Sequence, residues 1–272
     1  MNDFTIAELG ISDSPLLNSV KPDDWTNIPE IHEHYLRTAS CKSIKVIDKN
    51  NEILGLGTGI VFDSTGWLAH IIVSKNHQRK GIGTNIVLDR IKLLQEKYNC
   101  HTITLTATDQ GYPVYKKLGF IEESMYIIMT RPQDYQSSYP GNENIIKAEP
   151  KHFKEMLDID RITSGENREG LLQSVFGGGY VYVKNGGVQG FYLPQFGDGG
   201  VTAITQEAGI TLLRERMREE KKIFITEENI CAYDFLVDNG YKETKRIYRM
   251  ILGEPFTHSP QNCYSRIGGF AG

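Results

Sequence analysis

The sequence lacks the long apolar runs that a membrane-spanning segment requires. No apolar run in its 272 residues approaches the ~18 residues needed to cross a bilayer, and its first residues show no basic segment followed by an apolar core. A large excess of charge of one sign is also missing, because 30 basic and 34 acidic side chains leave a formal net charge of −4. We therefore expect neither a membrane nor a nucleic acid among the partners of this protein.

Cysteine is scarce, and its spacing is uninformative for cross-linking. Cys41, Cys100, Cys231 and Cys263 are far apart and fit neither a disulfide framework nor a zinc site. We expect no metal, a reducing compartment and hence a cytoplasmic location, and a monomer or a homodimer as the assembly. The length is sufficient for two compact domains with a core in each.

The most informative segment is an apolar strand at residues 68–73 that leads through a glycine turn into an amphipathic helix. The turn reads Gln78-Arg79-Lys80-Gly81-Ile82-Gly83-Thr84. Glycines let the backbone approach an anion, and the first amides of the helix point at it with a favourable dipole. The pattern predicts a pyrophosphate site, although an ordinary strand-to-helix turn contains similar residues.

Two other phosphate-binding loops do not fit this turn. A Walker loop needs Gly-Lys-Ser/Thr after its second glycine, and a Rossmann fingerprint needs a third glycine or an alanine where Ile86 lies. After the turn, apolar residues at helical spacing predict a helix from Gly83 to about Tyr98, and a strand follows at residues 102–107. Asp109 lies where the next helix begins, and we expect it to cap that helix.

The stretch from Trp67 to Phe120 resembles motifs A and B of the GNAT N-acetyltransferases. The Gln/Arg-x-x-Gly-x-Gly/Ala turn of motif A matches Gln78, Gly81 and Gly83, and the Tyr-x-x-x-Gly-Phe ending of motif B begins at Tyr115. The resemblance implies an α/β fold (α+β, mixed sheet) and acetyl-CoA as the acyl donor. It assigns to the cofactor the main chain of Ile71, Ile72 and Val73 at the acetyl and pantetheine portion and the residues of the turn at the pyrophosphate, namely Gln78, Arg79, Lys80, Gly81, Ile82, Gly83 and Thr84.

The resemblance also assigns a catalytic acid. In GNAT enzymes the tyrosine that corresponds to Tyr115 often lies near the thioester sulfur, where it can protonate the departing thiolate. A tyrosine on the apolar face of a helix is also an ordinary core residue with a hydrogen bond, so this role is a hypothesis.

A general base is not evident. Strand alternation puts Trp67, Ala69 and Ile71 on one face, where many GNAT enzymes carry a carboxylate or a histidine, and neither Trp67 nor Ala69 can take a proton. The same count puts His70 on the opposite face, which predicts a packed, hydrogen-bonded core histidine. Trp67 is instead a candidate wall of the acceptor pocket, or plain core.

An early helix supplies the remaining candidates for the acceptor site. It carries Glu30, His32, Glu33 and His34, and the resemblance places such a helix along the acceptor. We expect Glu30 and His34 to contact the acceptor, and one of the four residues could serve as the base. A solvated helix face explains these charges equally well.

The order of expected strands and helices occurs twice, which predicts tandem GNAT-like folds. We expect a catalytic domain at residues 1–131, a linker at 132–143, a degenerate GNAT-like domain at 144–256 and a C-terminal tail at 257–272. In the second half Leu236 stands where the first half has Tyr115, and no Gly-x-Gly turn precedes the long helix. We infer that the second half has lost its coenzyme site.

The second half also resembles the C-terminal lobe of a group of two-domain GNAT proteins. Its Asp-Arg...Gly-x-x-Arg segment matches Asp160, Arg161, Gly165 and Arg168. A structural ion pair between Asp160 and Arg168 beneath a helix end is the simplest interpretation.

The sequence therefore predicts an acetyl-CoA-dependent N-acetyltransferase that moves an acetyl group directly to a small-molecule amine in a ternary complex. The alternatives are a non-catalytic acyl-CoA-binding sensor, or an O-acetyltransferase or protein acetyltransferase.

Overall fold

The chain forms two compact units in its computed structural model, which describes residues 4–23, 25, 27–131, 139–219 and 222–272. The first unit consists of Met1–Leu105 with Leu252–Glu254, and the second of Thr106–Ile251 with Pro255–Gly272. The units therefore divide the chain at a different place from the repeat in the sequence. Residues 132–138 of the expected linker lie outside the described residues.

The first unit contains a mixed sheet. Its neighbouring strands are antiparallel, except that β4 and β5 are parallel. In spatial order the strands are β1 (Thr5–Glu8), β2 (Cys41–Ile47), β3 (Ile53–Phe62), β4 (Thr65–Val73) and β5 (Thr102–Ala107). The parallel pair needs a crossover, and the glycine turn and the helix after it supply this connection.

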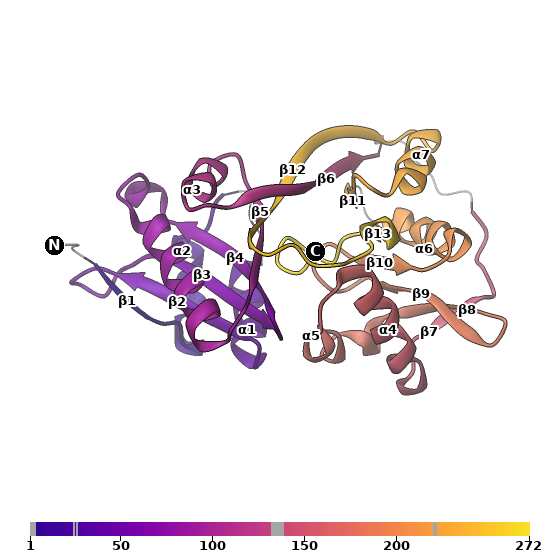
Figure 1. Ribbon diagram of the computed structural model, residues 1–272, viewed down its shortest axis with the longest axis horizontal. Coiled ribbons are helices and arrows are strands. Elements are labelled where there is room, and N and C mark those ends of the chain that lie inside the picture. Colours follow the sequence, from indigo (N-terminus) through magenta and orange to yellow (C-terminus); the bar gives the residue numbers. More distant parts are fainter. Residues whose placement is uncertain (1–3, 24, 26, 132–138, 220–221) are drawn as a thin grey trace. The chain divides into compact units, whose positions relative to one another are not determined.

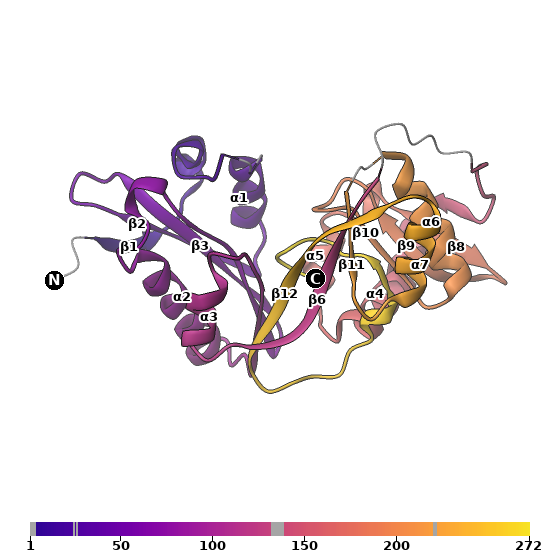
Figure 2. The same ribbon diagram turned by 90° about the horizontal axis from the view of Figure 1, so that it is seen from above.

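Two helices, α1 (Ile28–Arg37) and α2 (Ile82–Lys92), cover opposite faces of this sheet, as Figure 2 shows. A π-helical turn, Leu93–Lys97, extends α2, so the helix expected up to about residue 98 is present. The α2 face packs closely because β3 has a glycine there. A Cβ at Gly57 would lie 2.4 Å from Cγ2 of Ile86, so any larger residue would push the helix away.

Each face of the first unit has its own apolar core. A set of buried residues on the α1 side joins that helix to the chain before it, and these are Leu9, Leu17, Val20, Ile28, Ile53, Leu56 and Ile72. A second set joins α2 to the strands, and these are Ile44, Val46, Leu54, Ile82 and Ile86. The strand β4 therefore lies between two packed layers.

In the second unit, strands that belong to different sequence repeats pair with each other. The long strand β6 (Ile121–Thr130) pairs on one side with β11 (Lys222–Thr226) and on the other with β12 (Lys242–Gly253), both antiparallel. Before β6 lies the short helix α3 (Tyr112–Lys117). A strand from the first repeat is therefore enclosed by two strands from the second.

A five-stranded antiparallel sheet completes the second unit (Figure 1). Its strands in spatial order are β13 (Cys263–Ser265), β10 (Gly200–Ala203), β9 (Gly187–Leu193), β8 (Tyr180–Lys184) and β7 (Ile145–Lys147). Besides α3, the described part of this unit contains the helices α4 (Phe153–Ser164), α5 (Glu169–Gln173), α6 (Gln206–Glu219) and α7 (Ile230–Asp238). The expected C-terminal tail thus provides an edge strand.

The helices α3 and α7 end in the same way, which gives the repeat a structural counterpart. The amide of Phe120 donates to the carbonyl of Tyr115 (3.1 Å), and the amide of Tyr241 donates to the carbonyl of Leu236 (3.0 Å). In each case the intervening glycine has a positive φ, as this helix ending requires. The expected correspondence of Tyr115 with Leu236 therefore holds in the local backbone structure.

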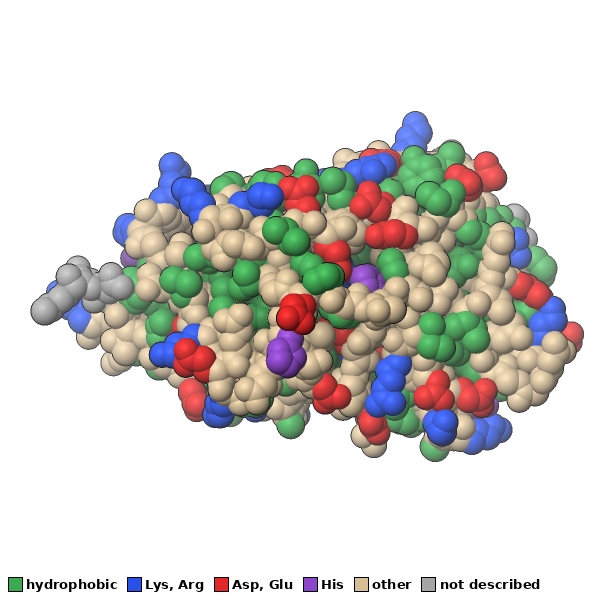
Figure 3. Space-filling view, in the orientation of Figure 1, with side chains coloured by type: hydrophobic (Ala, Val, Ile, Leu, Met, Phe, Trp, Pro, Cys, Tyr) green, Lys and Arg blue, Asp and Glu red, His purple; other side chains and the backbone are tan. Residues whose placement is uncertain are grey.

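The expected mixed α/β fold is confirmed, and the strand expected at residues 102–107 has the observed bounds of β5. None of the helices in the described part of the chain has the length and apolar character that a bilayer crossing requires. Basic and acidic side chains are interspersed on the face drawn in Figure 3.

Candidate functional site

The glycine turn joins β4 to α2 through two residues with left-handed backbone. Gly81 has φ 81° at the N-cap of α2, and Arg79 has φ 61°. The amide and the side-chain Nδ2 of Asn85 both donate to the carbonyl of Gly81, at 3.0 and 2.9 Å. Nε2 of Gln78 donates to the carbonyl of Val73 at 3.3 Å, which closes the turn onto the end of the strand.

This turn has the features of an anion site. Gln78, Arg79, Lys80 and Gly81 are exposed, so their side chains and backbone are accessible. The first three amides of α2 lie in the turn of the helix that has no intrahelical acceptors. Together with the helix dipole and the two cations, these amides favour a phosphate group.

The other predicted cofactor residues lie next to the turn. Ile71 and Val73 are half-buried and Ile72 is buried in β4, while Ile82 is buried beneath the first turn of α2. A Cβ at Gly83 would lie 3.4 Å from Val73 Cγ2, so the start of α2 lies within van der Waals reach of the end of β4. The structure thus brings all of the predicted cofactor residues together at one end of β4 and α2.

A β-bulge interrupts β4 at His70. The register between β3 and β4 shifts there, so that His70 and Ile71 both face the single residue Gly57. His70 has φ 48°, in the left-handed region that non-glycine residues seldom adopt. A Cβ at Gly57 would contact the side chains of both Ile71 and Ile86, so Ile71 projects toward α2.

The bulge places His70 on the face opposite to the one expected. Thr58 follows Gly57 and therefore projects toward α1, and so does its cross-strand partner Ala69. His70 also projects toward α1, where its Nδ1 lies 2.9 Å from the hydroxyl of Tyr35. Strict alternation, which separated His70 from Trp67 and Ala69, fails here because the bulge inserts one residue.

Four rings meet on this face, and we call them the His70 cluster: Trp25, His32, Tyr35 and His70. The ring of His70 lies edge-on to Trp25 at 5.8 Å and to His32 at 5.7 Å between centroids, and the ring of Tyr35 lies 5.5 Å away. His32 and Tyr35 come from successive turns of the inner face of α1. Trp25 and His70 are partly exposed, so the cluster reaches the surface.

Burial fixes the protonation of two members of the cluster. His32 is completely buried and neither ring nitrogen has a hydrogen-bond partner among the described residues. Desolvation and the neighbouring His70 lower the pKa of His32 to about 3, so it is neutral at physiological pH. Desolvation likewise raises the pKa of Tyr35 well above its usual value, so it remains a phenol.

The residues expected to contact the acceptor are not members of this cluster. Glu30 projects to the exposed side of α1 and His34 is half-buried, with a pKa lowered by desolvation. Trp67 is completely buried. The residue that sequence reasoning missed is Tyr35, whose spacing of three from the candidate His32 places both on one face of a helix, opposite a strand histidine.

Tyr115, the predicted acid, lies in α3 of the second unit. Its side chain is 7% exposed and its ring packs on Phe120 at 5.8 Å between centroids. Burial raises the pKa of Tyr115 to about 12. Asp109 does not cap α3 as expected, because its carboxylate pairs with Nζ of Lys245 at 2.6 Å and the amide of Gly111 donates to Thr108 Oγ1.

The start of α6 is the position in the second half that corresponds to the start of α2. It carries a negative charge, whereas the turn before α2 carries positive charges. The amide of Ala208 donates to Thr205 Oγ1 at 3.4 Å at the start of α6. Glu207 in the first turn of α6 forms hydrogen bonds with Lys184 Nζ at 2.6 Å and with the hydroxyl of Tyr182 at 2.7 Å. A carboxylate of the chain itself thus lies at the helix start and repels a phosphate.

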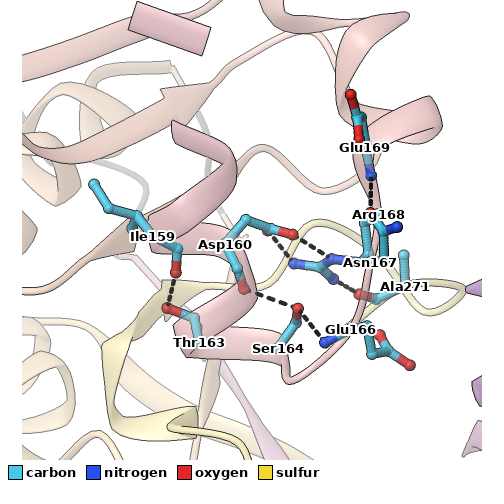
Figure 4. Close-up of polar contacts among 9 residues, drawn as sticks. All are labelled: Ile159, Asp160, Thr163, Ser164, Glu166, Asn167, Arg168, Glu169 and Ala271. Carbon is cyan, nitrogen blue, oxygen red and sulfur yellow. Dashed lines mark hydrogen bonds and ion pairs between the residues drawn. The ribbon is translucent and has the colours of Figure 1, made fainter. Parts of the chain in front are cut away.

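The Asp160–Arg168 pair is a buried ion pair at the end of α4 (Figure 4). The guanidinium also donates to the carbonyl of Ala271 in the C-terminal tail. Burial alone would lower the pKa of Arg168, but the charge and hydrogen bonds of Asp160 outweigh it and raise that pKa. The expected structural ion pair is present, and it also anchors the tail.

Most of the mixed sheet, the turn and the helix after it lie within one segment that matches a known family. Residues 13–120 match the Acetyltransferase (GNAT) family, which supports an acyltransferase enzyme. A search of curated proteins found no match to the sequence.

Solved structures share the fold of the whole chain. A candidate acetyltransferase from Pyrococcus horikoshii has a TM-score of 0.84 at 20% identity, covering 100% of this chain and 97% of that one. A GCN5-related N-acetyltransferase from Sphaerobacter thermophilus has a TM-score of 0.62 at 13% identity, covering 96% and 99% of the two chains. At these identities the likeness concerns the fold.

Proposed function

We propose that this protein is an acetyl-CoA-dependent N-acetyltransferase that transfers acetyl directly to a small-molecule amine in a ternary complex. The observation that carries the proposal is the turn at Gly81, where left-handed backbone, helix amides and two cations converge beside the end of β4. In this reading the turn binds the pyrophosphate, and the main chain of Ile71, Ile72 and Val73 binds the pantetheine and acetyl portion. Trp67, Glu30 and His34 stay predicted acceptor residues.

The second half does not provide another donor site in this proposal. The helix start that would hold a second pyrophosphate carries the carboxylate of Glu207, which is engaged by Lys184 and Tyr182. A dianionic group there would replace favourable contacts by repulsion. We therefore expect one acetyl-CoA site per chain.

His70 is the proposed general base. It follows Ala69 on the α1 face and directly precedes the segment assigned to the acetyl group. In the tautomer with the proton on Nδ1, that proton is donated to the oxygen of Tyr35, and Nε2 is the basic nitrogen. The same hydrogen bond strengthens when the imidazole becomes cationic, because its donor is then charged.

His70 and Tyr115 together account for the proton transfers in the reaction. The amine nitrogen attacks the thioester carbonyl, and its proton passes to Nε2 of His70. The carbon–sulfur bond then breaks, and the departing thiolate takes a proton from the hydroxyl of Tyr115. The raised pKa of Tyr115 supports this role, because the phenol keeps its proton until it is needed.

An acceptor screen tests the proposal. Release of free coenzyme A is measured with acetyl-CoA and a panel of amines, amino acids, amino sugars and matched alcohols in which a hydroxyl replaces the amine. Release that requires an amine supports the proposal. Release with the alcohols instead would indicate an O-acetyltransferase, and acetyl-CoA binding without release would indicate a sensor.

A further inference from the structure

Arg266, which follows β13, is held in one orientation within the second unit. Its amide donates to the carbonyl of Phe224 at 2.8 Å, and its Nε donates to the carboxylate of Asp198 at 2.7 Å. The guanidinium lies over the rings of Phe224 and Tyr126, at 4.1 and 5.1 Å from their centroids. The residue is only 6% exposed, so this cation is fixed rather than solvated.

The turn after Arg266 is fixed as well. The carbonyl of Gly268 accepts hydrogen bonds from the amides of Ala271 and Gly272, at 3.3 and 3.1 Å. The carbonyl of Ala271 in turn accepts from the guanidinium of Arg168 (Figure 4). Gly269 therefore occupies a defined position beside Arg266.

Two buried polar atoms beside Gly269 have no hydrogen-bond partner among the described residues. They are Nη1 of Arg266 and Oγ1 of Thr106. One methyl-sized position touches both side chains, because a Cβ at Gly269 would lie 3.7 and 3.9 Å from Nη2 and Nη1 of Arg266 and 3.9 Å from Cβ of Thr106. Thr106 and Gly269 are partly exposed, so this position borders the surface.

We propose that Arg266, Thr106 and Gly269 form a binding site for the carboxylate group of a small ligand. One carboxylate oxygen accepts from the guanidinium, and the other accepts from the hydroxyl of Thr106, which provides partners for both buried atoms. The absence of a side chain at Gly269 lets the ligand approach. A flat, immobilised guanidinium fits the planar carboxylate geometry better than a lysine would.

The surrounding charges favour a monoanion over a phosphate. Asp198 already neutralises part of the charge of Arg266, and Arg168 is engaged by Asp160. Glu166 is 3% exposed, and its charge, like those of Arg266 and Arg168, shifts the pKa of Tyr126. Glu166 therefore adds negative charge near the arginines. A dianion would meet more repulsion here than a single carboxylate.

Binding of acetate, the smallest carboxylate probe, tests the site directly. The Nε–H signal of Arg266 is followed in the ¹⁵N-labelled full chain while acetate is added to about 10 mM. Thr106→Val keeps the shape of the side chain and removes the hydroxyl, and we expect it to weaken binding about tenfold. Gly269→Ala fills the position without a clash and should weaken binding at least as much.

Gly170→Ala is the matched control, because a Cβ there would meet nothing within 4 Å. It should bind acetate as the unaltered protein does. Thermal unfolding of each variant checks that the fold is retained. No shift of the Arg266 signal in the unaltered protein, or equal affinity in the protein with and without the Thr106 hydroxyl, would overturn the proposal.

A second comparison identifies the source of the carboxylate. Amino acids and their amides differ only in this group, so their KM values are compared as acceptors in the unaltered protein and in Thr106→Val. A KM that rises only for the amino acids makes the ligand the acceptor, whereas an unchanged KM together with lost binding makes it an effector. The site does not depend on the proposed acetyl transfer, since failure of acetyl-CoA to bind would leave the acetate result intact.

Discussion

His70→Asn is the substitution that most sharply tests the proposed chemistry. The backbone of His70 is left-handed, and asparagine tolerates this conformation, whereas alanine would add strain of roughly 1–2 kcal/mol. Asparagine can still pair with the hydroxyl of Tyr35, but it cannot take a proton. The change therefore removes the base and retains the bulge.

The expected loss of activity follows from the role of His70 as a general base. General-base catalysis contributes about 10²–10⁴ in rate, so kcat should fall by this factor, which corresponds to a barrier higher by about 2.7–5.5 kcal/mol. The affinity for acetyl-CoA should stay within about twofold, because His70 lies outside the glycine turn. The assay is release of coenzyme A at saturating donor and acceptor.

The pH dependence of kcat provides a second test of the same assignment. The pH profile of kcat should differ between the unaltered enzyme and His70→Asn, because only the unaltered enzyme carries the proposed base. His32 does not contribute near neutrality, because its pKa is about 3, and Tyr35 remains protonated. His101→Asn, at an exposed histidine of the same unit, is the control. A rate for His70→Asn within about threefold of the unaltered enzyme would refute the assignment.

Three further substitutions have defined outcomes. Tyr115→Phe should lower kcat by about tenfold or more. Because burial raises the pKa of Tyr115 to about 12, the unaltered enzyme should show no alkaline loss of activity from this group below about pH 11. A full rate for the variant at saturating substrate would remove Tyr115 from the mechanism. Arg168→Met leaves Asp160 charged and buried, so urea unfolding should show a loss of about 3–5 kcal/mol that adding Asp160→Leu largely restores, and a loss below 1 kcal/mol would contradict a buried pair. Gly165→Ala would place a Cβ 2.3 Å from the carbonyl oxygen of Thr257 at φ 72°, so the free energy of unfolding should fall by about 3 kcal/mol or more. For Gly186→Ala, with φ 80° and no neighbour within 4 Å, the fall should be about 1 kcal/mol. Equal losses would show that the contact is relieved without cost.

Local structure was largely predictable from the sequence. The strand β5 and the helix that includes α2 follow directly from apolar periodicity, and the glycine turn has local features that need no tertiary information. The repeat of the helix ending at Gly119 and Gly240 was also visible, because a positive φ requires glycine there.

The face of His70 was not predictable in this way. A bulge depends on how two strands pair, and a single strand sequence contains only alternation. For the same reason the pairing of β6 with β11 and β12 was not foreseen, since strand pairing is a long-range property. The role of the tail as an edge strand, anchored by Arg168, likewise depends on contacts between distant residues.

Titration of acetyl-CoA into the purified protein by calorimetry tests the central claim most directly. We predict one site per chain, abolished by Gly81→Asp and retained by Gly186→Asp, which introduces the same side chain at nearly the same φ in a turn far along the chain. Two sites, or equal binding by the two variants, would contradict a single donor site at the glycine turn.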